Sequence, residues 1–169
     1  MLLLIGCQNS SNTLKTNLIG MVTTEFKRLE MNGMTIEWQH RGNEILFKIN
    51  APTEGWVALG FTETDEIVQS NLIFVGQKRK RRKVLNHYVV GFGNHQHTEA
   101  LGGQTAARLL TAEEKNGRTT ASFTMPSAAL DKFHYNLSEG NELWFICAFS
   151  ADDDLQHHSR MREHKKVIL

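Results

Sequence analysis

Short segments in which hydrophobic and polar residues alternate recur along this chain, and turn-forming residues separate them. The segment at 44–50, Glu-Ile-Leu-Phe-Lys-Ile-Asn, alternates loosely, as a strand with one buried face does. Asn-Gly pairs at 32–33 and 116–117 supply the positive φ angles that two-residue hairpin turns require. Strands are predicted at 22–29, 35–39, 44–50, 56–61, 71–75, 83–90, 119–125, 143–149 and 166–169.

Helical periodicity is weak by comparison. The best candidates for helices are two short segments, 106–114 and 127–132, and the glycine-containing segment 91–105 is expected to form a long loop over one end of the domain. Many short strands separated by turns predict an all-β fold, an antiparallel β-sandwich. The length of 169 residues is enough for one such domain with a substantial core.

The rest of the chain is organised around the stretch 55–75, which predicts two strands joined by a short acidic loop. Gly60 interrupts the large residues of the first strand. Because a glycine has no side chain, it lets another group come close to the backbone. That group is either the second sheet of the sandwich or a flat ligand.

Charge is unevenly distributed. The run Lys-Arg-Lys-Arg-Arg-Lys at 78–83 holds six of the 19 basic residues, and without it the chain carries 13 basic and 18 acidic residues, a balance of −5. The run is expected at the tip of a hairpin. There it either contacts anionic lipid or an acidic partner, or it is simply solvated. No nucleic-acid partner is predicted.

The N-terminal residues Leu-Ile-Gly-Cys at 4–7 resemble a bacterial lipobox. The resemblance implies that Cys7 is acylated and becomes the first mature residue, which would hold the protein to a membrane of the bacterial cell envelope, at its periplasmic or outer-membrane face. Residues 1–7 would then be the signal, 8–20 a polar tether, and 21–169 the folded domain. The sequence departs from a usual signal because no basic residue precedes the leucines. The alternative is a frayed apolar tail.

Cysteines and histidines give few signals of a metal site. Cys147 lies in an apolar strand, where a buried and inert thiol is expected. The absence of a Cys-x-x-Cys pair excludes covalent haem attachment and a cysteine-built zinc site. His95 and His97 would share one face of an extended segment, but a pair alone is a weak metal signal, and exposed loop histidines are the alternative. Neighbouring His157 and His158 would face opposite ways in a strand.

Several segments, in this order, resemble the DOMON domain. The most specific are Gly-Trp-Val-Ala-Leu-Gly-Phe at 55–61 and His158 followed by a basic residue four places later. The remaining segments are 35–38, 121–126 and 143–149. The resemblance covers roughly residues 25–169. It implies an immunoglobulin-like β-sandwich outside the cytoplasm that binds haem b or sugars and often serves electron transfer.

In haem-binding members of that family, a methionine in the loop after the Gly-Trp segment and a histidine near the C-terminus are the axial ligands. By the resemblance, His158 occupies the histidine position, and the methionine position falls on Ile67. An aliphatic side chain cannot coordinate iron, whereas thioether and imidazole are usual ligands of an electron-transfer haem. Either the site is five-coordinate with His158 as its sole ligand, or His157, His95 or His97 supplies the sixth position.

Three functions remain open from the sequence. In the first, the domain binds haem b in a slot beside Gly60 with His158 as the sole or main ligand, for electron transfer to a redox partner protein. Alternatively, the slot is free of haem and its aromatic residues, Trp56, Phe61 and Phe74, stack on a carbohydrate or another flat ligand. In the third, the slot is filled by the domain's own side chains and the domain is a structural or adhesive module of the envelope. An enzyme is not predicted, because no nucleophile elbow or Ser-His-Asp order is present.

Overall fold

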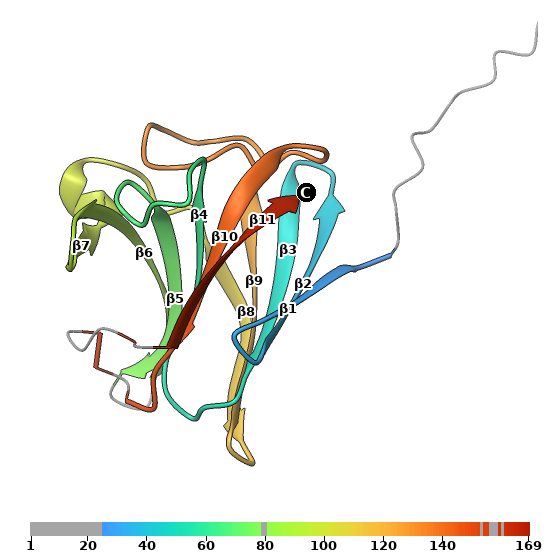
Figure 1. The fold of residues 1–169 in the computed structure, drawn as a ribbon, viewed down its shortest axis with the longest axis vertical. Helices are drawn as coiled ribbons and strands as arrows, with labels where there is room; N and C mark the ends of the chain where they lie inside the picture. The colour runs from blue at the N-terminus through green and yellow to red at the C-terminus, as the bar shows by residue number, and fades with distance from the viewer. Residues whose placement is uncertain (1–24, 79–80, 153, 156–158, 160) are drawn as a thin grey trace, which may run out of the picture.

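The computed structural model describes residues 25–78, 81–152, 154–155, 159 and 161–169. These residues form two antiparallel sheets that pack face to face (Figure 1). The predicted all-β, immunoglobulin-like antiparallel β-sandwich is confirmed. The predicted anchor at Cys7 and the tether at 8–20 lie outside the described residues.

The first sheet has five strands in the order β1-β2-β3-β9-β8. Each neighbouring pair is antiparallel, and short hairpins join β1 to β2, β2 to β3 and β8 to β9. The strand bounds are β1 Lys27–Met31, β2 Met34–Arg41, β3 Glu44–Ala51, β8 Arg108–Lys115 and β9 Arg118–Pro126.

The second sheet has six strands in the order β11-β10-β4-β5-β6-β7. Strand β4 pairs with β10 on one side and β5 on the other, so the segment at 55–75 lies in the middle of this sheet. A short 3-10 helix, Thr98–Leu101, follows β7. The strand bounds are β4 Val57–Thr62, β5 Asn71–Lys78, β6 Arg81–Gly91, β7 Asn94–His97, β10 Glu142–Phe149 and β11 Met161–Ile168.

Both predicted Asn-Gly turns form. Asn32 and Gly33 have φ angles of 50° and 69°, and Asn116 and Gly117 have 54° and 74°. Positive φ at both central residues matches the right-handed twist of the strands that such a turn joins. The two turns therefore fix the register of β1 against β2 and of β8 against β9.

The prediction of helices at 106–114 and 127–132 is wrong. Most of the first segment forms the edge strand β8, and the second is a loop. Residues of β8 alternate between exposed and half-buried, and the strand pairs along its length with β9. Tertiary pairing thus overrides the helix propensity of its alanines, leucines and glutamates. The segment 91–105 is also more ordered than the expected loop, because it includes β7 and the 3-10 helix.

The core lies between the two sheets. Four phenylalanines are its largest fully buried side chains: Phe47, Phe61, Phe123 and Phe145. The ring of Phe145 meets those of Phe47 and Phe61 edge to face, with centroids 6.1 Å and 5.3 Å away. Such pairs stabilise a core beyond their burial of apolar area.

Cys147 is buried in this core, as predicted. Burial raises the pKa of its thiol to about 12, because the charged thiolate is disfavoured away from water. An inert thiol follows from that environment.

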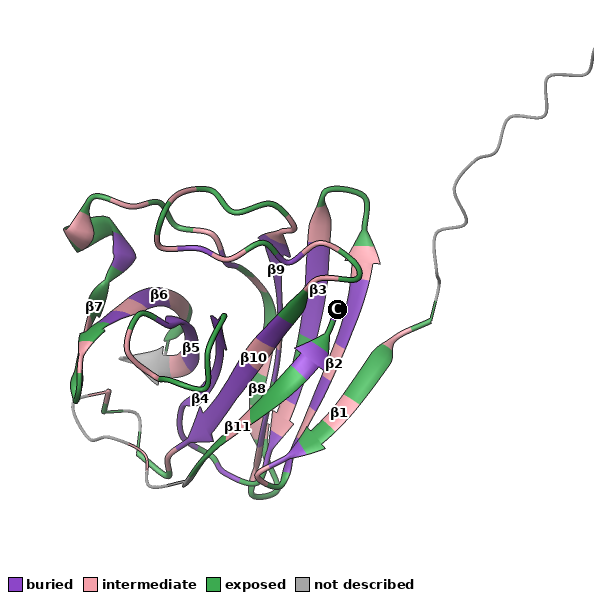
Figure 2. Ribbon diagram, turned by 45° about the horizontal axis from the view of Figure 1, so that its top comes forward, coloured by how far each residue is buried: buried purple, intermediate pink, exposed green. Residues whose placement is uncertain are grey.

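Strand β4, in the middle of the six-stranded sheet, is buried on both faces. All six residues of β4 are buried, and Figure 2 shows this strand as buried along its length. Val57, Leu59 and Phe61 belong to the core between the sheets, whereas Ala58 belongs to a second apolar cluster on the outer face. A strand buried on both faces reads as a continuous apolar run, which is the pattern of this segment.

Candidate functional site

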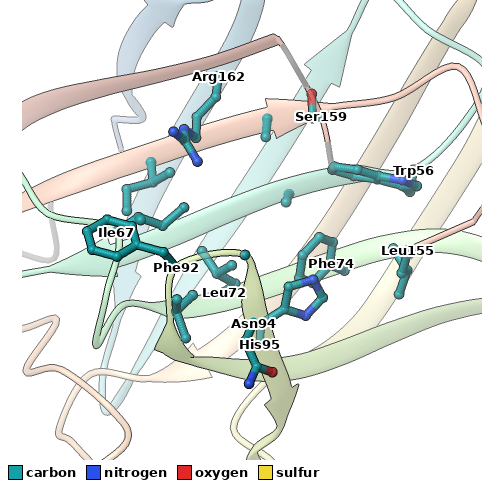
Figure 3. A pocket seen from close by; sticks show the side chains of 15 residues that line it. Trp56, Ile67, Leu72, Phe74, Phe92, Asn94, His95, Leu155, Ser159 and Arg162 are labelled. Atoms are coloured by element: carbon teal, nitrogen blue, oxygen red, sulfur yellow. The ribbon is translucent and has the colours of Figure 1, made fainter. Parts of the chain in front are cut away.

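A hollow of about 250 Å³ lies on the outer face of the six-stranded sheet, on the side away from the five-stranded sheet. Strands β4, β5 and β10 form its floor, and the hairpin between β6 and β7 forms one wall (Figure 3). Most of its lining is apolar. The lining residues are Trp56, Ala58, Ile67, Leu72, Phe74, Val89, Phe92, Gly93, Asn94, His95, Ile146, Ala148, Leu155, Ser159 and Arg162.

Aromatic rings line one side of this pocket. Trp56 and Phe74 meet edge to face with ring centroids 5.2 Å apart. The imidazole of His95 also stacks on Phe74, with ring centroids 5.2 Å apart and 29° between the planes. Trp56 is held by its indole Nε1, which donates to the carbonyl of Asp154 at 3.2 Å. These contacts fix the rings in place before any ligand arrives.

The loop that carries Ile67 is tied to the sheet by backbone hydrogen bonds. The amide of Gln69 donates to the carbonyl of Val89 at 2.8 Å, and the amide of Val89 donates to Ser70 at 3.0 Å. The hydroxyl of Ser70 donates to the carbonyl of Ile67 at 2.6 Å. These bonds hold the loop so that Ile67 lies at the pocket wall, where it contributes an aliphatic side chain.

Three histidines gather where β6 pairs with β7. The Nδ1 atoms of His87 and His95 are 2.8 Å apart, at hydrogen-bond distance, and the rings of His87 and His97 have centroids 4.2 Å apart. Burial, assisted by the two neighbouring imidazoles, lowers the pKa of His87 to about 3. His87 is consequently neutral near pH 7, and its buried Nε2 has no hydrogen-bond partner among the described residues.

Polar groups at the pocket are few. Figure 3 shows the side chain of Arg162, from β11, directed toward the hollow, and Ser159 lies at the edge beside Trp56. The hydroxyl of Ser159 donates to the carbonyl of Phe149. Arg162 is the one guanidinium among the described lining residues, and its place beside an apolar floor suits a ligand that is mainly apolar and carries an acidic group.

The predicted site residues separate into two groups. Trp56, Ile67 and Phe74 line the pocket together. Gly60 lies beneath its floor, since a Cβ there would be 2.4 Å from the Leu72 side chain and 3.2 Å from the Cβ of Ile146. His158 lies outside the described residues, so its predicted role stays a prediction.

Phe61 is the exception. It points into the core between the sheets, where it contacts Phe47 and Phe145. The prediction that Phe61 lines one slot with Trp56 and Phe74 is therefore wrong. Successive side chains of a strand face opposite ways, and Phe61 follows Trp56 by five residues, an odd number. The slot itself is on the outer face of one sheet rather than between the two sheets.

The sequence did not indicate Phe92, Leu155 or the contact between His87 and His95. Phe92 is 82% exposed at the lip of the pocket and is a loop residue, so no periodicity marks it. The histidine contact depends on how β6 pairs with β7 across an irregularity between Val89 and Gly91. Ile146 and Ala148 could have been assigned to the pocket face from their alternation along β10.

A second hollow, of about 530 Å³, lies on the outer face of the five-stranded sheet. Its lining is largely polar and includes Arg28 and Glu37, whose charged groups are 3.6 Å apart. No aromatic side chain lines it among the described residues. It offers no stacking surface, so the pocket on the six-stranded sheet is the stronger site.

The described residues contain neither a clustered metal site nor a membrane-spanning helix. No group of three or more histidine, cysteine or acidic side chains is arranged to hold a metal ion there. Within the same residues, no helix has the length and apolar character needed to cross a membrane.

Comparisons with known proteins agree with this fold. The chain is similar to the cytochrome b domain of pyranose dehydrogenase from Coprinopsis cinerea, with a TM-score of 0.63, 10% identity, and coverage of 85% of this chain and 81% of that chain. It is also similar to the cytochrome domain of Myriococcum thermophilum cellobiose dehydrogenase, with a TM-score of 0.60, 13% identity and the same coverage, 85% and 81%. No curated protein matches the sequence. Residues 30–150 match the model of the DOMON domain, and the chain therefore belongs to the DOMON family.

Proposed function

We propose that this DOMON domain binds haem b in the pocket on the outer face of its six-stranded sheet, and that it transfers electrons without catalysing a reaction of its own. The observation that carries the proposal is the pocket itself. It combines a fixed set of aromatic rings, an apolar floor, one imidazole from His95 and one guanidinium from Arg162. The two similar structures are cytochrome domains by name.

The chemistry of the lining fits the parts of a haem. The porphyrin is flat and apolar, which suits the floor of Ala58, Leu72 and Ala148. Its propionates are acidic, and Arg162 provides a positive charge for one of them. An imidazole is a usual axial ligand of haem iron. When bound, the group would supply a one-electron redox centre.

The pocket is too small to enclose a whole porphyrin. Pockets that enclose a drug-sized ligand have volumes of about 300–1,000 Å³, whereas this hollow measures about 250 Å³. A porphyrin would therefore keep one edge at the surface of the domain. An exposed edge is where a redox partner protein can approach. Phe92, exposed at the lip, adds apolar surface there.

Ile67 supports a second candidate function. The family's methionine position is aliphatic here, and this wall offers no thioether to iron. Without iron coordination, the same pocket would bind a flat apolar ligand by stacking and burial alone. A carbohydrate is less well suited, because sugars need several hydrogen-bonding groups and the described lining is mainly apolar.

The test is the visible spectrum of the protein purified from a haem-sufficient host, followed by titration of the apoprotein with haemin. We expect a Soret band and quenching of Trp56 fluorescence, because this tryptophan lines the pocket. A variant that fills the hollow, Ala148→Phe, should lose both signals. Thr120→Phe places the same ring on the exposed face of the other sheet and should keep them.

Each outcome identifies one function. A colourless protein that does not respond to haemin refutes the haem proposal. Binding of iron-free protoporphyrin IX as tightly as haemin would instead support the second candidate function. Retention on a polysaccharide column that Trp56→Ala weakens would support carbohydrate binding.

We also propose that the domain is tethered at the bacterial cell envelope through Cys7, which the lipobox-like sequence supports. The test is metabolic labelling with a fatty acid in the native host. Cys7→Ser should abolish the label and release the protein from the membrane fraction. Unchanged fractionation of that variant would refute the anchor.

A further inference from the structure

We propose that His95 coordinates the iron of the haem in this pocket, in place of the thioether that the chain lacks at Ile67, and that His87 positions its ring. The inference rests on the proposed function and adds a named ligand to it. Among the described residues that line the pocket, His95 is the only one with an imidazole, thiolate or thioether.

The ring of His95 is held in a defined orientation by two contacts. It stacks on Phe74 at 5.2 Å with 29° between the planes, and its Nδ1 lies 2.8 Å from Nδ1 of His87. Because Nδ1 faces His87, the nitrogen that would meet iron is Nε2. A ligand whose ring is fixed in advance loses little freedom on binding.

His87 has the properties of a partner behind a metal ligand. It is 5% exposed, and its Nδ1 lies 2.8 Å from Nδ1 of His95, a distance at which it can accept a hydrogen bond from that ring. Histidines that bind metals almost always donate their other ring N–H to such a partner, which fixes the tautomer and raises the basicity of the ligand. Iron at Nε2 would select the tautomer in which Nδ1 of His95 donates to Nδ1 of His87.

A single histidine is sufficient at this site. The described residues have no cluster of three metal-binding side chains, but iron in haem takes four nitrogens from the porphyrin and needs only axial ligands from the protein. His97 does not fit this role, because it is exposed and does not line the pocket. It lies two residues from His95 on the same strand and is therefore a matched control.

The test compares haemin with iron-free protoporphyrin IX, which has the same shape and propionates. Apoproteins of the native chain, His95→Leu and His97→Leu are titrated with each. We expect His95→Leu to weaken haemin by roughly tenfold or more, since loss of even an outer partner costs about 10–100-fold in metal affinity. Its affinity for protoporphyrin IX should not change. His97→Leu should match the native chain in both titrations.

The outcomes separate the inference from the proposed function. If the native chain binds neither porphyrin, the proposed function fails and the inference with it. Haemin affinity and spectrum that are unchanged in His95→Leu would overturn the inference alone. An equal loss of both porphyrins would also overturn it, because His95 would then act only by packing on Phe74.

The positioning role of His87 has its own readout. His87→Phe should still bind haemin, but the reduction potential should rise, because His95 loses the acceptor that makes it a stronger donor to ferric iron. His87→Asn, which can still accept a hydrogen bond, should partly restore the potential. A purely structural role would lower the affinity for both porphyrins and leave the potential of the bound fraction unchanged.

Discussion

Replacing Gly60 by alanine tests whether the pocket floor is packed against the backbone of β4. The new Cβ would be 2.4 Å from Cδ2 of Leu72, 3.2 Å from Cβ of Ile146 and 3.3 Å from the carbonyl oxygen of Asn71. Carbon atoms in contact prefer about 3.5–4.0 Å, so the Leu72 methyl must move by about 1 Å. The other two atoms lie at the backbone of neighbouring strands and can move only slightly.

Two opposing effects set the size of the change. Adding a methyl to a packed site lowers the free energy of unfolding by about 1–3 kcal/mol. Replacing glycine by alanine also restricts the unfolded chain, which raises the free energy of unfolding by about 0.4–1 kcal/mol. We expect Gly60→Ala to lower the free energy of unfolding by about 1–2 kcal/mol. Gly91→Ala is the matched control, because a Cβ there meets nothing within 4 Å. Both variants share the effect on the unfolded chain, and their difference isolates the overpacking of about 1–3 kcal/mol.

The assay is urea unfolding followed by tryptophan fluorescence, with the slope m compared among the variants. The displaced Leu72 side chain should also reduce the affinity for a porphyrin in the same variant. The reasoning is refuted if Gly60→Ala and Gly91→Ala are equally stable, since the floor would then have free space above β4.

Two further substitutions and one labelling experiment test the fold. Phe145→Ala should lower the free energy of unfolding by about 3–5 kcal/mol in the same urea assay, because this fully buried ring contacts three other aromatic rings; a loss below about 1 kcal/mol would contradict the core assignment. In a Cys7→Ser variant, which leaves Cys147 as its one thiol, Cys147, whose pKa burial raises to about 12, should resist a thiol reagent at pH 8 in the folded protein and react in urea, and labelling of the folded variant would show that the site opens. Gly117→Ala should cost about 1–3 kcal/mol through its φ of +74° alone, since a Cβ there touches nothing within 4 Å; an unchanged midpoint of unfolding would show that the β8–β9 turn can take another form.

Much of the sandwich was predictable because strand patterns and turn chemistry agree along most of the chain. The Asn-Gly turn at 32–33 and the alternation at 44–50 predict β2 and β3 with nearly correct ends, whereas the strand predicted at 22–29 starts five residues before β1. The edge strand β8 was not predictable in the same way. Its sequence, Arg-Leu-Leu-Thr-Ala-Glu-Glu-Lys, contains mostly good helix formers, and only its pairing with β9 makes it a strand.

The candidate site was predictable only in part. Trp56 and Phe74 were found because large aromatic residues beside a glycine suggest a binding surface. The error over Phe61 arose because Phe61 and Trp56 were assumed to share one face. Side chains alternate along a strand, so two residues separated by five positions lie on opposite faces. The contact of His87 with His95 could not be read from the sequence, because an irregularity shifts the register of β6 against β7 by an amount that no local pattern specifies.

The double burial of β4 divides this strand between two tasks. Val57, Leu59 and Phe61 hold the sheets together, while Ala58 and Gly60 shape the surface beneath the pocket. The outward position Ala58 can therefore change the shape of the pocket floor while the inward residues keep the sheets together, whereas Gly60 lies too close to Leu72 and Ile146 to take a side chain without a loss of stability. The same sandwich can therefore carry a pocket floor of different shape as long as the inward-facing side chains of β4 are kept.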